Sequence, residues 1–384
     1  MAENNYDVAI IGGGLAGIAA SILLAKAEKR VILFEKHKYP FHRVCGEFVS
    51  NESRDFLISL GLNIEELELP SIDKLNISTS NGGMKTFPLN LGGFGISRYL
   101  LDHKLADIAK SNGVVVMEGT AVIDLAFHDA LELHEISTSD NTYTARIAIG
   151  AFGKRSAIDK QMNRPFIRKP LPPGRNFTAV KYHVKANLPD DAIELHIFKD
   201  GYCGISKVEG EGRYCMCYLT TAASLQQFGG DIKAMEEGVL FKNPILKEYL
   251  TQFPSLYPDP LVISQVNFSR KLPVEDHVLM TGDAAGLITP LCGNGMSMAL
   301  HAAALAIPMV EKFLEGTLNR IELERAYTNN WNRLFSMRLK VGRALQHLFF
   351  DERLIQYTLS ALQPFPSLSN YLIGRTHGKA FVSK

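Results

Sequence analysis

The sequence is poor in cysteine and holds a single tryptophan. Its 384 residues include five cysteines, and no pair of them has the C-x-x-C spacing of metal ligands. A disulfide scaffold uses cysteines in even numbers and at higher density, and a structural zinc site needs paired ligands. We therefore expect neither of them, and no metal site.

The chain also lacks an excess of charge of either sign. Lysine and arginine total 41 and aspartate and glutamate total 40, which gives a net charge of +1. Nucleic acid is held by a broad positive field, and none is present, so it is excluded as an expected partner. Hydrophobic residues make up 46% and charged residues 21%, as in ordinary globular proteins, and the length predicts more than one domain.

Long hydrophobic runs are missing as well. The longest apolar stretch, residues 296–310, contains His301 and Pro308 and is shorter than the roughly 20 residues that span a bilayer. The first residues pass into an apolar segment without the basic start and small-residue cleavage site of a secretory signal. We expect no transmembrane segment and a cytoplasmic location.

The N-terminal segment has the order of a nucleotide-binding unit. An apolar run at 6–11 predicts a strand buried on both faces, a glycine-rich turn follows at 12–17, and residues 18–27 favour a helix. A second apolar strand at 30–34 ends at Glu35, which completes a βαβ unit. The pyrophosphate of a dinucleotide would lie at the N-terminus of this helix, where unpaired N–H groups point outward.

The glycines of the turn have separate tasks in such a unit. Gly12 makes the tight turn, Gly14 lets the backbone approach the pyrophosphate, and Gly17 lets helix and strand pack closely. Glu35 can accept hydrogen bonds from ribose hydroxyls. The pattern does not decide between FAD and NAD. The candidate cofactor-binding residues of this unit are Gly12, Gly14, Leu15, Ala16, Gly17, Glu35 and Lys36.

A second constellation lies far downstream. A short apolar strand at 277–281 breaks at Gly282-Asp283, and a Pro-x-x-Gly-x-Gly motif at 290–295 precedes a helical stretch. Together with the glycine-rich turn, these motifs resemble the FAD-dependent oxidoreductases of the aromatic hydroxylase-fold superfamily, which includes geranylgeranyl reductases and flavin-dependent halogenases. The resemblance implies that Asp283 binds the ribityl chain of FAD and that the helix start faces the pyrimidine edge of the flavin. It favours FAD over NAD, and its cofactor-binding candidates are Gly282, Asp283, Gly293, Asn294 and Gly295.

Two further segments fit the same family. Residues 98–105 are similar to its R-x-x-L-D-x-x-L helix, whose arginine reaches toward the cofactor. Residues 43–50 are similar to the Cys-Gly segment of geranylgeranyl reductases, which runs past the flavin, and to the Gly-Glu-Ser segment of halogenases. These similarities add Arg43, Cys45, Gly46 and Arg98 to the cofactor-binding candidates.

The chain departs from the family at one place. The hydroxylases carry an Ala-Asp-Gly motif whose aspartate is shared between FAD and NADPH, and Phe152 stands where that aspartate would be. This departure disfavours a direct NADPH-driven hydroxylase cycle. No second G-x-G-x-x-G follows a strand, so a separate nicotinamide domain is not expected. Electrons would come from NAD(P)H that docks transiently, from a separate reductase or ferredoxin, or from free reduced flavin, and the sequence leaves these sources open.

The central part of the chain changes character. Short alternating segments between residues 170 and 270 predict an antiparallel sheet, and a hairpin around Asn81-Gly82-Gly83 would join it. The expected fold class is α/β, with a Rossmann-type FAD-binding domain interleaved with an antiparallel β-sheet substrate domain and followed by C-terminal helices. The expected ranges are 1–70, 96–170 and 265–316 for the FAD-binding domain, 71–95 and 171–264 for the substrate domain, and 317–384 for the C-terminal helical region.

Two residues are catalytic candidates. The Cys45 thiol, placed beside the flavin, could donate a proton to a substrate, and a structural thiol is the alternative. Tyr202 could orient a substrate, whereas a strand tyrosine more often packs in a core. The C-terminal helices are locally basic, which fits either contact with an anionic membrane surface or a solvated face.

The leading functional prediction is an FAD-dependent oxidoreductase. Within that class we favour a reductase that transfers hydride from flavin N5 to a C=C bond of a hydrophobic small molecule, isoprenoid or aromatic and polyketide-like. A monooxygenase that uses a flavin hydroperoxide is the first alternative, and a flavin electron carrier without its own substrate is the second. Halogenation is disfavoured because the halogenases of this family use a Trp-x-Trp motif, and Trp331 is the sole tryptophan.

Overall fold

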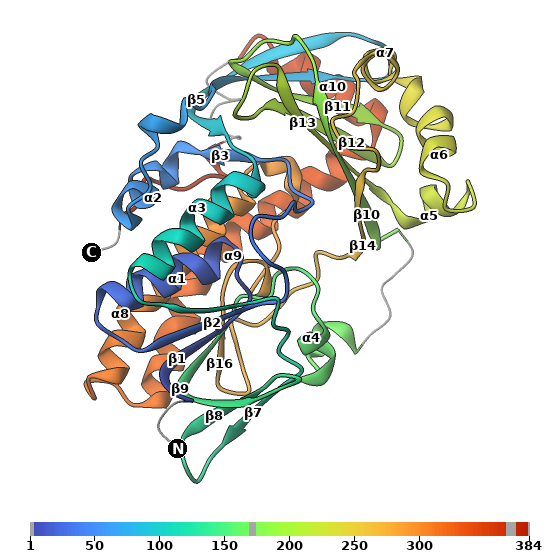
Figure 1. The fold of residues 1–384 in the computed structure, drawn as a ribbon. Coiled ribbons are helices and arrows are strands. Elements are labelled where there is room, and N and C mark those ends of the chain that lie inside the picture. The colour runs from blue at the N-terminus through green and yellow to red at the C-terminus, as the bar shows by residue number, and fades with distance from the viewer. Residues whose placement is uncertain (1–3, 169–173, 366–373, 383–384) are drawn as a thin grey trace.

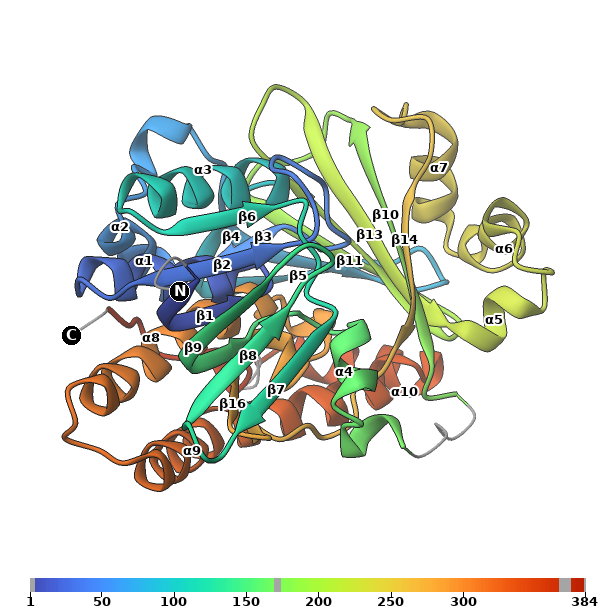
Figure 2. The ribbon, with the colours of Figure 1, turned by 60° about the horizontal axis from the view of Figure 1, so that its bottom comes forward.

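The computed structural model describes residues 4–168, 174–365 and 374–382. They form two eight-stranded sheets that lie side by side, with helices packed around both (Figures 1 and 2). The first sheet is mostly parallel and the second mostly antiparallel. This arrangement confirms the predicted fold class.

The first sheet is built on the N-terminal βαβ unit. Its central strand β1 pairs in parallel with β2 on one side and β9 on the other, and α1 is the crossover helix between β1 and β2. Its strand order is β15 (Val274–Glu275), β16 (Val278–Met280), β9 (Thr142–Gly150), β1 (Asn5–Ile11), β2 (Val31–Glu35) and β6 (Val115–Glu118), with β7 (Asp124–His128) and β8 (Leu133–Ser137) paired beyond β9.

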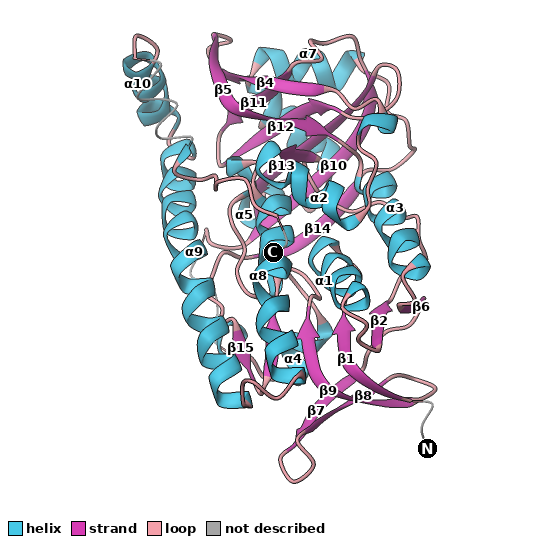
Figure 3. Ribbon diagram, turned by 90° about the vertical axis from the view of Figure 1, so that its left-hand side faces the viewer, coloured by secondary structure: helices cyan, strands magenta, loops and turns pink. Residues whose placement is uncertain are grey.

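Helices from distant parts of the chain pack around the first sheet. The helix α1 contacts both α3 and α8, and α8 in turn contacts α9, so that one continuous apolar core extends from β1 to the C-terminal helices. Figure 3 shows α8 between α1 and α9. The helices are α1 (Leu15–Lys26), α2 (Arg54–Leu60), α3 (Arg98–Ser111), α4 (Ala157–Gln161), α8 (Gly295–Leu314) and α9 (Arg320–Phe349).

The second sheet collects strands from three separate segments. Its order is β14 (Leu261–Val266), β10 (Phe177–Lys185), β13 (Arg213–Thr221), β12 (Gly201–Lys207), β11 (Ala192–Phe198), β4 (Ser71–Ser78), β5 (Met84–Gly95) and β3 (Phe48–Ser50). The predicted hairpin is β4–β5, and it joins the sheet through β11. The strand β3 belongs to this sheet although it lies within the range expected for the FAD-binding domain, so the domain boundaries stay a prediction.

The two faces of the second sheet bury different elements. One face packs Tyr218 and Phe198 against α5 (Ala222–Gln226), α6 (Ile232–Gly238) and α7 (Pro244–Gln252). The opposite face packs Leu195 and Tyr202 toward α10 (Glu352–Leu362). Because side chains alternate along a strand, each strand serves both cores. The short 3-10 helices are η1 (Asn51–Ser53), η2 (Glu65–Leu67), η3 (Pro165–Ile167), η4 (Leu240–Lys242), η5 (Gly282–Ala284) and η6 (Pro290–Cys292).

The structure differs from the sequence prediction in two details of this sheet. The strand β4, which comes from an earlier segment of the chain, pairs with β11 in parallel, whereas the sequence predicts an antiparallel sheet. The helices α5 to α7 were not predicted, since Gly229, Gly230 and Pro244 interrupt the segment and each helix is short.

The helix α8 is longer than the apolar stretch that the sequence indicates. It has 20 residues and is long and apolar enough to cross a membrane by length and composition alone. Its inner face, with Leu300, Ala303 and Ile307, is buried in the core that also contains residues of α1 and α9. This is the environment of a core helix, which passes the same length test as a membrane span.

Candidate active site

A cavity of about 1140 Å³ runs between the two sheets. One part lies at the carboxyl ends of β1, β2 and β9, where ligands bind in parallel α/β sheets. The other part lies along the second sheet and reaches α9 and α10. We name the two parts the cofactor half and the substrate half.

The cavity brings together residues that lie far apart in the sequence. All the candidates line it except Gly17 and Asn294, which are next to lining residues in the sequence. The candidates that line it are Gly12, Gly14, Leu15, Ala16, Glu35, Lys36, Arg43, Cys45, Gly46, Arg98, Tyr202, Gly282, Asp283, Gly293 and Gly295.

The glycine-rich turn has the geometry that a phosphate loop requires. Gly12 adopts φ +109°, which favours glycine, and a Cβ on Gly17 would lie 2.0 Å from the Gly12 carbonyl oxygen. A Cβ on Gly14 would meet only an Arg98 guanidinium nitrogen, at 3.7 Å. The turn is therefore tight beneath the helix and open at Gly14, toward the cavity.

Two helices begin at the cavity without a side-chain cap. The residue before α1 is Gly14, which has no side chain to cap the helix, and the residue before α8 is Asn294, whose side chain accepts no hydrogen bond from α8. By contrast, Ser97 caps α3 and Asn319 caps α9. Uncapped first-turn N–H groups and the positive end of the helix dipole favour an anionic ligand.

A chain of ion pairs crosses the mouth of the phosphate loop. Arg98 donates two hydrogen bonds of 2.7 Å to Asp102, and Arg43 bridges Asp102 at 2.9 Å and Glu35 at 2.8 Å. Burial opposes the charged guanidinium of Arg98, but Asp102 outweighs it and raises the pKa of Arg98. Glu35 also accepts the N–H groups of Gly13 and His37, each at 3.0 Å. The pairs fix both arginines at the place where a pyrophosphate would lie.

The far end of the cofactor half is formed by η5 and the turn before α8. Asp283 and Gly293 line it, and Gly293 adopts φ +63°. Behind Asp283, the buried Lys271 donates to the Asp283 carbonyl oxygen at 2.8 Å. Burial lowers the pKa of Lys271 to about 8, and nearby Asp159 and Asp283 only partly offset it.

The loop of residues 43–47 separates the two halves and is fixed at every carbonyl group before Glu47. Lys181 donates to the Arg43 carbonyl at 3.0 Å, and Ser206 donates to the Gly46 carbonyl at 3.2 Å. Lys154 and Cys215 bind the two carbonyls between them, each at 3.2 Å. A Cβ on Gly46 would meet nothing within 4 Å, so the open side of the loop faces the cavity.

Glu47 is fully buried beneath this loop and ties it to β10. Its carboxylate accepts from Lys181 and is hydrogen-bonded to His183, both at 2.5 Å, and it accepts the Arg98 N–H at 2.7 Å. Burial alone would raise the pKa of Glu47, but the Lys181 charge and the His183 hydrogen bond lower it to about 2. The carboxylate therefore stays ionised and joins the phosphate-side helix α3 to the substrate sheet.

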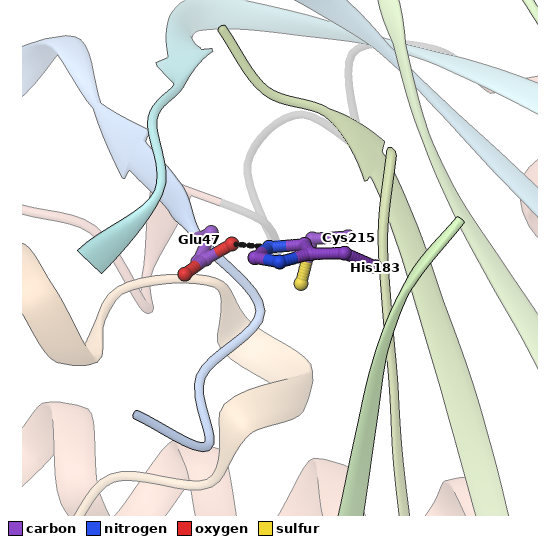
Figure 4. A group of neighbouring side chains, drawn as sticks. All are labelled: Glu47, His183 and Cys215. Atoms are coloured by element: carbon purple, nitrogen blue, oxygen red, sulfur yellow. Dashed lines mark hydrogen bonds and ion pairs between the residues drawn. The ribbon is translucent and has the colours of Figure 1, made fainter. Parts of the chain in front are cut away.

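The same cluster is the one place among the described residues where three metal-ligand types meet. The ligand atoms of Glu47, His183 and Cys215 lie within 4.8 Å of one another, and Figure 4 shows the Glu47 carboxylate directed at the His183 ring. The Lys181 ammonium already contacts this carboxylate, and burial raises the pKa of Cys215 well above its usual range. Because the carboxylate is already paired with an ammonium group and the thiol is neutral, these three residues are not arranged to bind a metal ion, and we derive no metal site from them.

The two catalytic candidates have different surroundings. Cys45 is half-buried, lines the cavity where its halves meet, and accepts the Glu47 N–H at 3.5 Å through its sulfur. Tyr202 is 3% exposed and lines the substrate half. Burial raises the pKa of Tyr202 far above its usual range, so its phenol is neutral. Their chemical roles stay predictions.

The substrate half is lined almost entirely by apolar side chains. The wall from the second sheet includes Ile77, Leu195 and Leu219, and the opposite wall includes Leu348 and Leu359. Gly204 lies in this wall, and a Cβ there would make only ordinary contacts, the nearest at 3.6 Å to Leu195. An elongated apolar molecule fits such a compartment.

The sequence analysis did not single out the residues that anchor the loop. Lys181 and His183 occupy alternate positions of the mostly buried strand β10, and His183 pairs across the sheet with Cys215, which pairs with Ser206. These residues therefore form one polar patch on a buried face. Two polar residues at alternate positions of a buried strand are the signal that could have indicated it.

Several known proteins are similar to most of the chain, and a family model matches its N-terminal part. Residues 10–66 match the family model described as an NAD(P)-binding Rossmann-like domain. Conditioned medium factor receptor 1 of Dictyostelium discoideum is 26% identical over 369 residues, 86% of this chain and 68% of that protein. Digeranylgeranylglycerophospholipid reductase 1 of Methanococcoides burtonii is 24% identical over 376 residues, which cover 93% of this chain and 88% of that protein. The menaquinone reductase of Mycobacterium tuberculosis is 22% identical over 335 residues, which cover 80% of this chain and 77% of that protein.

Solved structures share the fold over a similar extent. A flavoprotein/dehydrogenase of Cytophaga hutchinsonii has a TM-score of 0.79 at 18% identity and covers 96% of this chain and 92% of its own. A halogenase solved in complex with phloroglucinol and FAD has a TM-score of 0.73 at 16% identity and covers 97% and 85%.

The family match, the reductase relatives and the shared fold agree with the family that the sequence motifs resemble. They also confirm that the protein is an enzyme of the oxidoreductase class. The chain is therefore similar in sequence and in fold to the FAD-dependent oxidoreductases of the aromatic hydroxylase-fold superfamily.

Proposed function

We propose that the protein is an FAD-dependent reductase that adds hydrogen to a C=C bond of a hydrophobic small molecule with an isoprenoid or similarly apolar chain. The main support for this proposal is that one cavity has a cofactor half with polar and glycine-rich walls and a substrate half with apolar walls. The two halves meet at Cys45. The named relatives that reduce a geranylgeranyl lipid or menaquinone support an isoprenoid substrate.

The cofactor half fits FAD on three independent features. Gly14 and Gly46 leave open space where a Cβ would otherwise project. The uncapped start of α1 and the Arg98 guanidinium would hold the pyrophosphate, and Glu35 would bind a ribose. Asp283 would bind the ribityl chain, and the start of α8 would face the flavin ring. These residues would bind the pyrophosphate, a ribose and the ribityl chain of the cofactor.

The chemistry divides between cofactor and protein. Reduced FAD supplies a hydride at the flavin N5 position. The substrate half excludes water and orients the alkene, and Cys45 holds a proton on its sulfur where the two halves meet. The Cys45 thiol would give its proton to one alkene carbon while the other carbon takes up the hydride, and the thiolate would then regain a proton from solvent. Atoms and electrons then balance without oxygen.

An anaerobic reaction tests this proposal. The FAD-loaded protein is reduced with dithionite, which avoids any assumption about the natural electron donor, and is mixed with geranylgeraniol, whose only reducible groups are C=C bonds. We expect the flavin absorbance to return faster than in a blank and the product to gain two hydrogen atoms. Cys45→Ser should retain FAD and slow this return.

Other outcomes would identify the other functions. Return of absorbance only in air, with a product that gains an oxygen atom, would indicate a monooxygenase. Rapid oxidation by redox dyes with no organic product from any alkene would indicate an electron carrier. Either result would contradict the proposed reductase.

A further inference from the structure

The described residues 374–382 follow α10 in sequence but return to the cofactor half. They lie against the first part of α8, where Asn294 binds the Thr376 carbonyl and His301 stacks on Phe381, whereas Figure 3 draws α10 beyond the far end of α9. Thr376 and His377 line the same cavity as Gly293 and Gly295. We name residues 374–382 the C-terminal strap.

The strap is anchored by buried groups of the FAD-binding region. Glu52 is fully buried, and it accepts the Gly378 N–H through its carboxylate and the Phe381 N–H through its carbonyl, the latter at 3.2 Å. The Phe381 ring stacks on His301 with ring centroids 4.1 Å apart and lies 5.1 Å from Phe56. Two hydrogen bonds to a buried residue and a ring stack therefore anchor the strap to the body of the protein.

The strap also contacts Asn294, the residue that precedes α8. Asn294 is fully buried and donates from its side-chain amide to the Thr376 carbonyl at 2.8 Å. Its amide oxygen has no hydrogen-bond partner among the described residues and does not cap α8. Asparagine at this position ordinarily caps a helix by accepting an N–H from the first turn. Here the strap holds the amide in another orientation, and the N–H groups that begin α8 stay available to the cavity.

We propose that the C-terminal strap is a positioning part of the cofactor site, which walls the flavin end of the cavity and keeps the start of α8 open for the flavin. The inference rests on the proposed FAD site and deepens it. Negative charge on reduced flavin would be stabilised by the first-turn N–H groups that Asn294 leaves free. Binding of FAD and ordering of the strap must then strengthen each other by the same factor.

Two measurements on the full-length protein test the strap. The first is the dissociation constant of FAD, followed by flavin fluorescence, for Phe381→Ala and for a chain that ends at residue 373. We expect a rise of about tenfold or more for each variant. The matched control is Val382→Ala, because Val382 is 54% exposed on the same segment, and its FAD affinity should equal that of the wild type.

The second measurement is tryptic cleavage of the wild type at Arg375 and Lys379, which are both exposed. FAD should slow cleavage at these two sites, and it should do so without any variant having to fold. Equal affinity in Phe381→Ala together with cleavage that FAD does not change would overturn the strap alone. A wild type that takes up no FAD would overturn the proposed function as well, so the two failures are distinguishable.

Discussion

Gly14 leaves room for a cofactor where the glycine-rich turn faces the cavity. A Cβ there would meet only the end of the Arg98 side chain, at 3.7 Å. Gly14→Val should therefore fold normally and still fill the space needed for close approach of a pyrophosphate. We expect FAD affinity to fall by about tenfold or more, measured by fluorescence titration. A fully yellow Gly14→Val protein with unchanged affinity would contradict the placement of the phosphate site.

Gly204 is the corresponding residue of the substrate half. The nearest atoms to an added Cβ are Leu195 Cδ2 at 3.6 Å and the Cys217 carbonyl oxygen at 3.8 Å, so a larger side chain would project into the cavity. Gly204→Leu should weaken binding of geranylgeraniol by about tenfold and of a short isoprenoid alcohol much less, measured by the change in flavin absorbance. FAD affinity should not change, and Gly14→Val gives the reciprocal control. Equal weakening for both alcohols would show that Gly204 does not set the depth of the compartment.

Single residues with a strict local signature could be predicted from the sequence. Gly12, Gly17 and Glu35 follow from the order of strand, turn, helix and strand, because the turn geometry admits few other residues. Glu47 could not be predicted in the same way. Its partners Lys181 and His183 lie more than a hundred residues away, and only the folded chain brings them under one loop.

At the scale of elements, the loop of residues 43–47 depends on the charge of Glu47. Its pKa is lowered from 4.5 to about 2, so the stability it contributes is complete above about pH 5 and is lost as the pH falls toward 2. The shift corresponds to about 3 kcal/mol. Glu47→Gln would also leave the Lys181 ammonium buried without its partner, which costs about 3–5 kcal/mol.

We expect urea unfolding, followed by circular dichroism, to show Glu47→Gln destabilised by about 3 kcal/mol or more at neutral pH. The difference from the wild type should shrink between about pH 5 and pH 2, where the wild-type carboxylate becomes protonated. Glu66→Gln, at an exposed acid, serves as the matched control and should show neither effect. A difference that is independent of pH would mean that Glu47 acts through packing alone.

Elements with strong periodicity could also be predicted, and weaker ones could not. The strand at 6–11, the helix that follows and the β4–β5 hairpin appear where the sequence places them, since their patterns are local. The parallel pairing of β4 with β11 and the return of the strap to α8 depend on contacts between segments that are far apart in the sequence, 82 residues in the case of Asn294 and Thr376. Hydrophobic pattern alone carries no information about such partners.

At the scale of the whole molecule, the two sheets are joined more tightly than two successive domains would be. The first core includes Val49 of β3 and Phe94 of β5, which are strands of the second sheet. Arg164, fully buried, links Asp159 to Glu275 within the FAD-binding region. Unfolding of either sheet would therefore expose apolar side chains of a core to which both sheets contribute. The predicted cytoplasmic location and membrane contact stay predictions, since they depend on surroundings that the fold does not contain.

This shared core predicts one cooperative unfolding transition for the FAD-loaded protein. Trp331, the sole tryptophan, is 3% exposed against Phe335, so its fluorescence reports on the C-terminal helices, while release of FAD reports on the cavity and circular dichroism on both sheets. The three signals should change at the same temperature, and added FAD should shift them together, because a ligand of the folded state stabilises the whole cooperative unit. Release of FAD at a lower temperature than the tryptophan change would instead mean that the cofactor half opens by itself. That result would show that the cofactor site can unfold while the shared core stays folded.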